Sequence, residues 1–233
     1  MPELPEVEAL RAFLESRAVG EAVVGAELGS FTVLKTVVPP PDALIGAPVD
    51  SVSRHGKFLD LDCGGTRLIF HLARAGWLRW SESLPATVIR PGKSPIALRV
   101  RLSDGSGFDL TEAGTKKRLA AYVVEDPRLV PGIATLGPDP LRSDFTLERF
   151  AEILGGRRAQ IKGVLRDQGI IAGIGNAYSD EILHVAKMSP FALASSLDAD
   201  AVARLHAALR ETLVAARAVQ AHGREVVVGR LRV

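Results

Sequence analysis

Cysteine is nearly absent from this sequence, in which Cys63 is the single thiol among 233 residues. One cysteine excludes an intrachain disulfide and any cysteine-rich zinc site built within this chain, so we expect Cys63 to be a small buried apolar residue. The five histidines are scattered, and none is paired with another at metal-ligand spacing. The sequence therefore predicts no metal site.

Long apolar runs are also absent. No run approaches the roughly 18 residues of a membrane span, and no basic-then-apolar signal segment precedes the Pro-Glu start. We therefore expect a soluble, cytoplasmic protein with no membrane partner. The formal net charge of +2 is too small to identify a nucleic-acid partner by itself. With 47% apolar and 24% charged residues, the composition is that of an ordinary globular protein of one large or two small domains.

The first residues, Met1-Pro2-Glu3, are the first candidate for chemistry. If Met1 is removed, Pro2 presents a secondary amine that is partly unprotonated at neutral pH. Attack of this amine on an aldehyde-like carbon gives a cationic iminium, which favours elimination from the neighbouring carbon. Glu3 is placed to move the protons as a general acid and base.

The same stretch also has a purely structural interpretation. Pro5 suits the first turn of a helix, and Glu6 and Glu8 favour its positive end. Gly20 can end this helix, whose apolar stripe consists of Val7, Leu10, Phe13 and Leu14. The two interpretations are compatible, because a helix would hold the terminus on a rigid element.

The pattern of the chain divides it into a strand-rich part and a helical part. Two pairs of alternating segments, 57–62 with 67–72 and 97–102 with 108–111, flank glycine-containing turns and predict hairpins of an antiparallel sandwich or barrel. Further on, apolar stripes at helical spacing predict helices at 147–154, 161–165, 176–185 and about 198–221. We predict an α+β protein with a β-sandwich domain and N-terminal helix at 1–130, a Pro/Gly-rich linker at 131–143, an all-helical domain at 144–222 and a tail at 223–233.

The segment Gly173-Ile174-Gly175-Asn176 precedes a predicted helix, with Asn176 as its N-cap. As a dinucleotide fingerprint it is incomplete, because the third glycine is missing and the preceding apolar run is too short for a parallel core strand. The alternative is anion binding, in which exposed N–H groups and the Asn176 amide hold a phosphate.

Basic residues recur near this segment and in three other places. Arg157, Arg158, Lys162 and Arg166 recur at helical spacings and form either a solvated helix face or a clamp for the DNA backbone. Lys57 is predicted to begin a strand, either as an ordinary edge residue or as a phosphate contact and proton carrier. Lys116-Lys117-Arg118 form either a DNA-facing or a solubilising loop. His71, inside an apolar strand, is predicted to be a hydrogen-bonded structural histidine.

Four stretches taken together resemble the formamidopyrimidine-DNA glycosylase and endonuclease VIII family of base-excision repair enzymes. These stretches are Pro2-Glu3-Leu4-Pro5-Glu6-Val7-Glu8, Arg54-His55-Gly56-Lys57-Phe58-Leu59, His71-Leu72 with Gly76 and Leu78-Arg79, and Gly173-Ile174-Gly175-Asn176-Ala177-Tyr178 with Asp180-Glu181. Their order and spacing cover nearly the whole chain, and this agreement is more specific than any single motif.

The resemblance implies roles for individual residues. Pro2 would be the Schiff-base nucleophile, Glu3 the general acid and base, and Lys57 a lysine that transfers protons in β-elimination and contacts phosphate. Glu6 stands where the family has a lesion-site carboxylate. Asn176 and Arg158 match ligands of the DNA backbone, and the further candidates for DNA contact are Arg157, Lys162, Gly175, Tyr178, His71, Lys116, Lys117 and Arg118.

The resemblance also implies an architecture and a partner. The β-sandwich would be followed by a helix-two-turn-helix domain, with damaged double-stranded DNA in the cleft between them and the lesion flipped out of the duplex. The resemblance thus predicts a bifunctional DNA glycosylase and AP lyase that removes oxidised bases. We expect it to be monomeric, nucleoid-associated and without a nucleotide cofactor.

Some family features are missing from this chain. Family members usually end in a zinc finger with four cysteines, so we expect zinc only if a finger has been lost by truncation. None of the tail arginines, Arg224, Arg230 and Arg232, matches the arginine of that finger. Arg74 stands near the void-filling methionine of the family, and residues 111–118 replace a loop that carries its void-filling arginine and phenylalanine. The preferred lesion and opposite base therefore stay open.

Two other functions stay open as well. The first is a binding module for damaged or abasic DNA with weak or no turnover, because the finger is missing. The second is a dinucleotide-binding enzyme built on residues 173–176.

Overall fold

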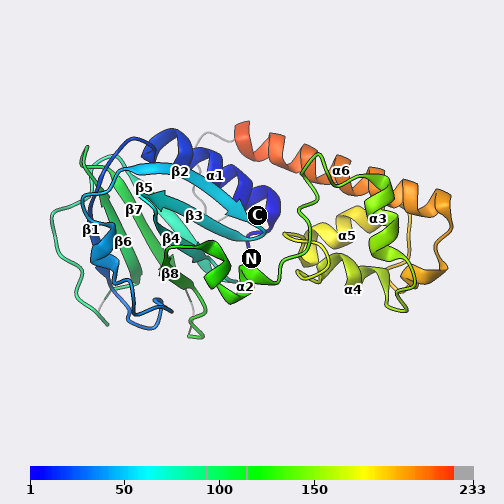
Figure 1. The fold of residues 1–233 in the computed structure, drawn as a ribbon, viewed down its shortest axis with the longest axis horizontal. Helices are drawn as coiled ribbons and strands as arrows, with labels where there is room; N and C mark the ends of the chain where they lie inside the picture. Colours follow the sequence, from blue (N-terminus) through cyan, green and yellow to red (C-terminus); the bar gives the residue numbers. More distant parts are fainter. Residues whose placement is uncertain (93, 114, 223–233) are drawn as a thin grey trace.

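The computed structural model describes residues 1–92, 94–113 and 115–222, and Figure 1 shows a β-rich part and a helical part side by side. The elements are α1 (Leu4–Ala18), β1 (Val23–Leu28), the 3-10 helix η1 (Pro41–Leu44), β2 (Val49–His55), β3 (Phe58–Cys63), β4 (Thr66–His71), β5 (Gly76–Ser81), β6 (Ile96–Leu102), β7 (Gly107–Glu112), β8 (Ala120–Val124), η2 (Pro127–Leu129), α2 (Pro131–Ala134), α3 (Leu147–Leu154), α4 (Ile161–Arg166), α5 (Asn176–Val185), η3 (Ala194–Ser196) and α6 (Ala199–His222). The predicted α+β class is confirmed.

The strands form two four-stranded antiparallel sheets with the orders β1-β6-β7-β5 and β2-β3-β4-β8. Both predicted hairpins are present as β3–β4 and β6–β7. Alternation along β4 places Leu68 and Phe70 in a core that includes residues of both sheets, whereas Ile69 packs with Val124 and Val130 in a small separate cluster. Cys63 is buried in the main core, as predicted.

The N-terminal helix α1 covers the β-rich part and connects it to the helical part. Its residues Val7, Leu10 and Leu14 are buried in the sandwich core. The same helix packs against α6, whose C-terminal end lies beside it in Figure 1. The chain start is therefore held where the two parts of the molecule meet.

The helical part has a second core, to which α3, α4, α5 and α6 contribute. The predicted helices are confirmed, with one difference at the start of α5. The N-cap of α5 is Gly175, and Asn176 is its first residue. The predicted linker contains the short helix α2. Within the described residues, no helix is long and apolar enough to cross a bilayer.

Candidate active site and DNA-binding surface

The carboxylate of Glu3 lies against the first turn of α5. This side chain is only 4% exposed, and it accepts hydrogen bonds from the backbone N–H groups of Gly175 at 2.6 Å, Ala177 at 3.0 Å and Tyr178 at 3.3 Å. The first N–H groups of a helix have no partner within the helix, and the helix dipole favours an anion there. A carboxylate that precedes α1 thus caps α5.

Two glycines make this close approach possible. A Cβ atom at Gly175 would lie 2.3 Å from Oε1 of Glu3, and one at Gly173, which has φ of +90°, would lie 2.6 Å from Cδ1 of Leu4. The N–H of Leu4 donates to the carbonyl oxygen of Gly173 at 2.9 Å. The glycines therefore accommodate the N-terminal segment of the chain itself.

This geometry corrects two interpretations of the Gly173–Asn176 segment. The expectation that the α5 N–H groups hold a phosphate is wrong for Gly175, Ala177 and Tyr178, because these groups donate to Glu3. Turns, not a strand, precede α5, so the segment lacks the strand-to-helix context of a dinucleotide fingerprint. The Asn176 side chain is exposed and stays a candidate DNA ligand.

Glu6 joins the chain start to α5 a second time. Its Oε2 accepts the N–H of Glu3 at 2.9 Å, and its Oε1 accepts the hydroxyl of Tyr178 at 2.7 Å. Burial and the neighbouring Glu6 raise the pKa of Tyr178 far above its ordinary value, so the hydroxyl remains a donor. Tyr178, a predicted DNA ligand, thus uses both its hydroxyl and its N–H inside the protein.

Lys57 lies in the turn between β2 and β3, not at the start of a strand as predicted. The side chain is 8% exposed, and Nζ donates to the carbonyl oxygen of Ile174 at 2.9 Å. Burial lowers the pKa of Lys57, and Arg166 lowers it further, whereas Glu3 opposes the shift. A lysine with a lowered pKa exchanges protons more readily near neutral pH, as a proton carrier must.

Half-buried Pro2 lies directly before Glu3 in the chain. Together with Glu3, Glu6, Lys57 and Tyr178 it forms what we call the N-terminal site. All four residues predicted to be catalytic belong to this site. Their chemical roles stay predictions.

Arg54 ties this site together, a role that its position in the sequence does not indicate. Its guanidinium donates to Glu8 on α1 at 2.9 Å, to the carbonyl oxygen of Gly56 at 2.9 Å and to Asp139 in the predicted linker at 2.5 Å. The side chain is 6% exposed. Burial raises the pKa of Glu8, but hydrogen bonds from Arg54 and Arg11 outweigh burial and lower it. Arg54 therefore connects α1, the Lys57 turn and the linker.

The predicted basic ligands of the DNA backbone lie on α4 and between α3 and α4. Arg157 and Arg158 are exposed and lie between α3 and α4, so the predicted shared helix face is wrong for these two residues. Lys162 lies on α4, and its ammonium is paired with Asp180 at 2.6 Å. The Nε of Arg157 donates to the carbonyl oxygen of Ile153 at 2.5 Å. The contact of Arg158 with phosphate stays a prediction.

His71 is a hydrogen-bonded structural residue, as predicted. Its Nδ1 accepts the N–H of Ala73 at 3.1 Å, and its ring lies 4.8 Å from that of Phe58. Burial, with a smaller contribution from Lys57, lowers its pKa to about 4. The ring is therefore neutral at physiological pH, with its proton on Nε2. Its role as a DNA ligand stays a prediction.

The basic loop before β8 is folded around Glu112. The buried carboxylate of Glu112 accepts the N–H of Arg118 at 2.8 Å and that of Leu119 at 3.1 Å, and the Lys117 ammonium donates to the Glu112 carbonyl oxygen. The side chains of Lys116, Lys117 and Arg118 are exposed. Their contact with DNA stays a prediction.

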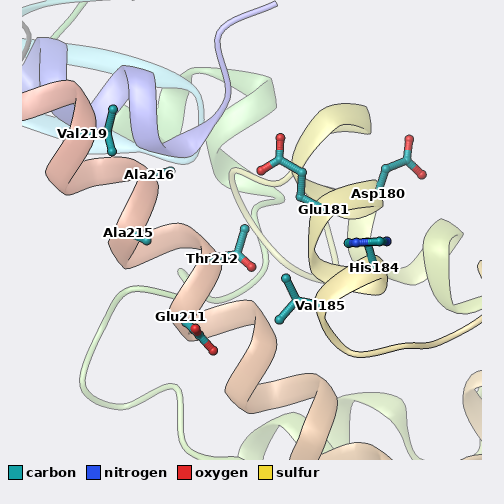
Figure 2. A pocket seen from close by; sticks show the side chains of 9 residues that line it. All are labelled: Asp180, Glu181, His184, Val185, Glu211, Thr212, Ala215, Ala216 and Val219. Carbon is teal, nitrogen blue, oxygen red and sulfur yellow. The ribbon is translucent and has the colours of Figure 1, made fainter.

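A separate groove of about 600 Å³ lies between α5 and α6 (Figure 2). Its lining residues are Asp180, Glu181, His184, Val185, Glu211, Thr212, Ala215, Ala216 and Val219. Three acidic side chains in this lining disfavour a phosphate. None of the predicted site residues lines the groove, so we do not assign the catalytic chemistry to it.

Comparisons with known proteins agree with this geometry. Residues 1–119 match the family model of the formamidopyrimidine-DNA glycosylase N-terminal domain, and residues 136–227 match the model of its H2TH domain. The chain belongs to the formamidopyrimidine-DNA glycosylase family. The resemblance found in the four sequence stretches is thereby confirmed, and so are the helix-two-turn-helix domain and the enzyme class, a DNA glycosylase of base-excision repair.

Individual relatives cover most of the chain. Formamidopyrimidine-DNA glycosylase from Symbiobacterium thermophilum is 36% identical over 96% of this chain and 72% of its own length. The enzyme from a Roseiflexus species is 38% identical over 91% of this chain and 77% of its own length. The Lactococcus lactis enzyme bound non-covalently to DNA with an AP site superposes with a TM-score of 0.82 and 30% identity, covering 95% of this chain and 84% of that chain.

The zinc finger of the family cannot be built from the cysteines of this sequence. Cys63 is the single thiol; it is buried in the core, and burial raises its pKa to about 12. A structural zinc site needs several deprotonated thiols or imidazoles in one place, so Cys63 does not fit this group. The predicted tail 223–233, with Arg224, Arg230 and Arg232, lies outside the described residues.

Proposed function

We propose that this glycosylase is also an AP lyase that works through the amine of Pro2, removing an oxidised base and then cleaving the DNA strand. The observation that carries the proposal is the contact between the Glu3 carboxylate and the start of α5. This contact holds the chain start between the two parts of the molecule, and Lys57 donates to the carbonyl oxygen of the same Ile174–Gly175 peptide whose N–H donates to Glu3. The Lactococcus lactis relative was crystallised on DNA with an AP site and on DNA with Fapy-dG, which supports DNA of this kind as the substrate.

The reaction follows from the chemistry of the N-terminal site. With Met1 removed, the Pro2 nitrogen attacks C1′ of the damaged nucleotide, the bond from C1′ to the base breaks, and the base leaves with the bonding electrons and takes up a proton from water. Glu3 passes the amine proton to the sugar ring oxygen as the ring opens to the iminium. Lys57 then takes a proton from C2′, the electrons of that C–H bond form the C2′=C3′ double bond, and the 3′ phosphate leaves with the electrons of the broken C3′–O bond. The steps described use the Pro2 amine and the side chains of Glu3 and Lys57.

We propose that the protein binds damaged double-stranded DNA as a monomer, with the backbone held by Asn176 and Arg158. Phosphate neutralisation by cations releases counterions, so binding should weaken steeply with salt. Phosphate contacts orient the duplex without reading its sequence. The lesion would leave the base stack to reach Pro2.

Borohydride trapping tests the proposal. The untagged protein is incubated with duplex DNA carrying one abasic site, and sodium borohydride reduces any iminium to a stable covalent adduct. We expect an adduct with the untagged protein, a strongly reduced yield with Pro2→Gly, and none when the N-terminus is blocked by a tag. Tight binding without an adduct would refute the lyase mechanism and support the binding-module alternative.

A further inference from the structure

A short chain of hydrogen bonds leads from α5 to the peptide that carries Pro2. The Tyr178 hydroxyl donates to Oε1 of Glu6 at 2.7 Å, and Oε2 of Glu6 accepts the N–H of Glu3 at 2.9 Å. This N–H belongs to the peptide bond between Pro2 and Glu3. One carboxylate therefore links a side chain of the helical part to the residue that precedes α1.

The hydrogen bond from the Tyr178 hydroxyl to Glu6 is strong, because the donor is buried and the acceptor is charged. Tyr178 is 8% exposed, and burial together with Glu6 raises its pKa, so the phenol keeps its proton. A hydrogen bond from a neutral donor to a carboxylate is roughly twice as strong as one between neutral groups. The backbone N–H of Tyr178 also donates to Glu3, so one residue of α5 holds both carboxylates.

We propose that Glu6 and Tyr178 are positioning residues that orient the Pro2 amine, and that Glu6 acts through the Pro2–Glu3 peptide instead of contacting the damaged base. The inference rests on the proposed function of Pro2. Each Glu6 oxygen already accepts a donor of the protein, and both donors belong to the N-terminal site. Such a carboxylate fixes the rotation of the peptide that bears the nucleophile.

This role predicts where the effect of a substitution appears. Misplacing a reacting group by about 1 Å can slow a reaction about 100-fold. A positioning residue is needed whenever the amine attacks, including attack on an abasic site from which the base is already gone. A base contact is needed only while the damaged base is present.

The test compares Tyr178→Phe with the wild type on two duplexes, one with a preformed abasic site and one with an oxidised base. The variant loses only a hydroxyl. We expect the single-turnover rate constant for borohydride-trapped adduct to fall about 10-fold or more on both duplexes. Tyr122→Phe is the matched control, because Tyr122 is the other tyrosine and lies on β8, and its rate constants should equal those of the wild type.

The outcomes separate the alternatives. Slowing on the oxidised base alone, with unchanged trapping on the abasic site, would overturn the inference and make Glu6 a base contact. A variant that is merely less well folded would show a lower adduct amplitude with an unchanged rate constant, which would also overturn it. Glu6→Gln should behave like Tyr178→Phe, because an amide cannot accept both donors. A wild type that forms no adduct would instead refute the proposed function.

Discussion

The carboxylate of Glu3 and the backbone N–H of Gly175 lie 2.6 Å apart, although 172 positions separate them in the sequence. The contact joins the start of α1 to the start of α5. Two stretches that carry separate motifs thus form one site.

Gly175→Ala should destabilise the protein and abolish strand cleavage. The new Cβ would lie 2.3 Å from Oε1 of Glu3, which forces the carboxylate away from its donors. Loss of hydrogen bonds to a buried charged group costs about 3 kcal/mol. Gly163→Ala on α4 is the control, because its Cβ would meet nothing within 4 Å. This variant should raise the free energy of unfolding by about 0.5–1 kcal/mol, since alanine is favoured over glycine inside a helix. Equal unfolding free energies for the two variants, measured in urea, would contradict this account.

Arg54→Met should lower the free energy of unfolding by about 3–5 kcal/mol, because it leaves the carboxylates of Glu8 and Asp139 without their shared cation. Adding Asp139→Asn should recover part of this loss. The comparison variant is Arg128→Met, whose exposed ion pair with Asp126 should contribute nothing measurable. If Arg54→Met unfolds at the same urea concentration as Arg128→Met, the connecting role of Arg54 is wrong.

The stability of the wild type should fall as the pH falls from about 6.5 to about 4. Over this range the unfolded chain binds a proton at His71 that the folded protein does not, because burial lowers the folded pKa to about 4. The contribution is at most about 3 kcal/mol. His71→Asn keeps an acceptor for the N–H of Ala73 but does not titrate, so its unfolding free energy should fall less between about pH 7 and pH 4.5. Parallel losses in both proteins would exclude His71 as the cause.

Arg158→Ala should weaken DNA binding equally for all sequences and reduce the salt slope by about one unit. Lys162→Ala should have a smaller effect, because Asp180 already pairs with that ammonium. Binding to a duplex with a non-cleavable abasic analogue, titrated over a range of salt concentrations, measures both. A larger change for Lys162→Ala would reverse our assignment of the backbone contact.

The hairpins and helices could be predicted from the sequence because their signals are local. Alternation along β3 and β4 and the glycines between them identify a hairpin without knowledge of the rest of the chain. The helical spacing of Arg157 and Arg158 with Lys162 and Arg166 likewise predicted a shared helix face. The structure ends α3 at Leu154, and Gly156 has φ of +70°, so the helical spacing does not continue through these residues.

The use of the glycine motif could not be predicted from its own residues. Gly173 and Gly175 indicated close approach of an anion to the start of α5, and this was correct. The motif does not distinguish an external phosphate from a carboxylate of the same chain, because both accept the same N–H donors. The roles of Arg54 and Tyr178 were missed for a related reason, since their partners lie in distant segments.

The most direct test of the account identifies which amine bonds to DNA. Lys57 is the competing nucleophile, because its pKa is lowered and it lies in the same site. After borohydride trapping on an abasic duplex, nuclease digestion and cleavage at arginine, mass spectrometry locates the sugar remnant. We predict that it lies on the peptide 2–11, at the Pro2 nitrogen. A remnant on the peptide 55–67, which contains Lys57, would show that Lys57 and not Pro2 is the nucleophile.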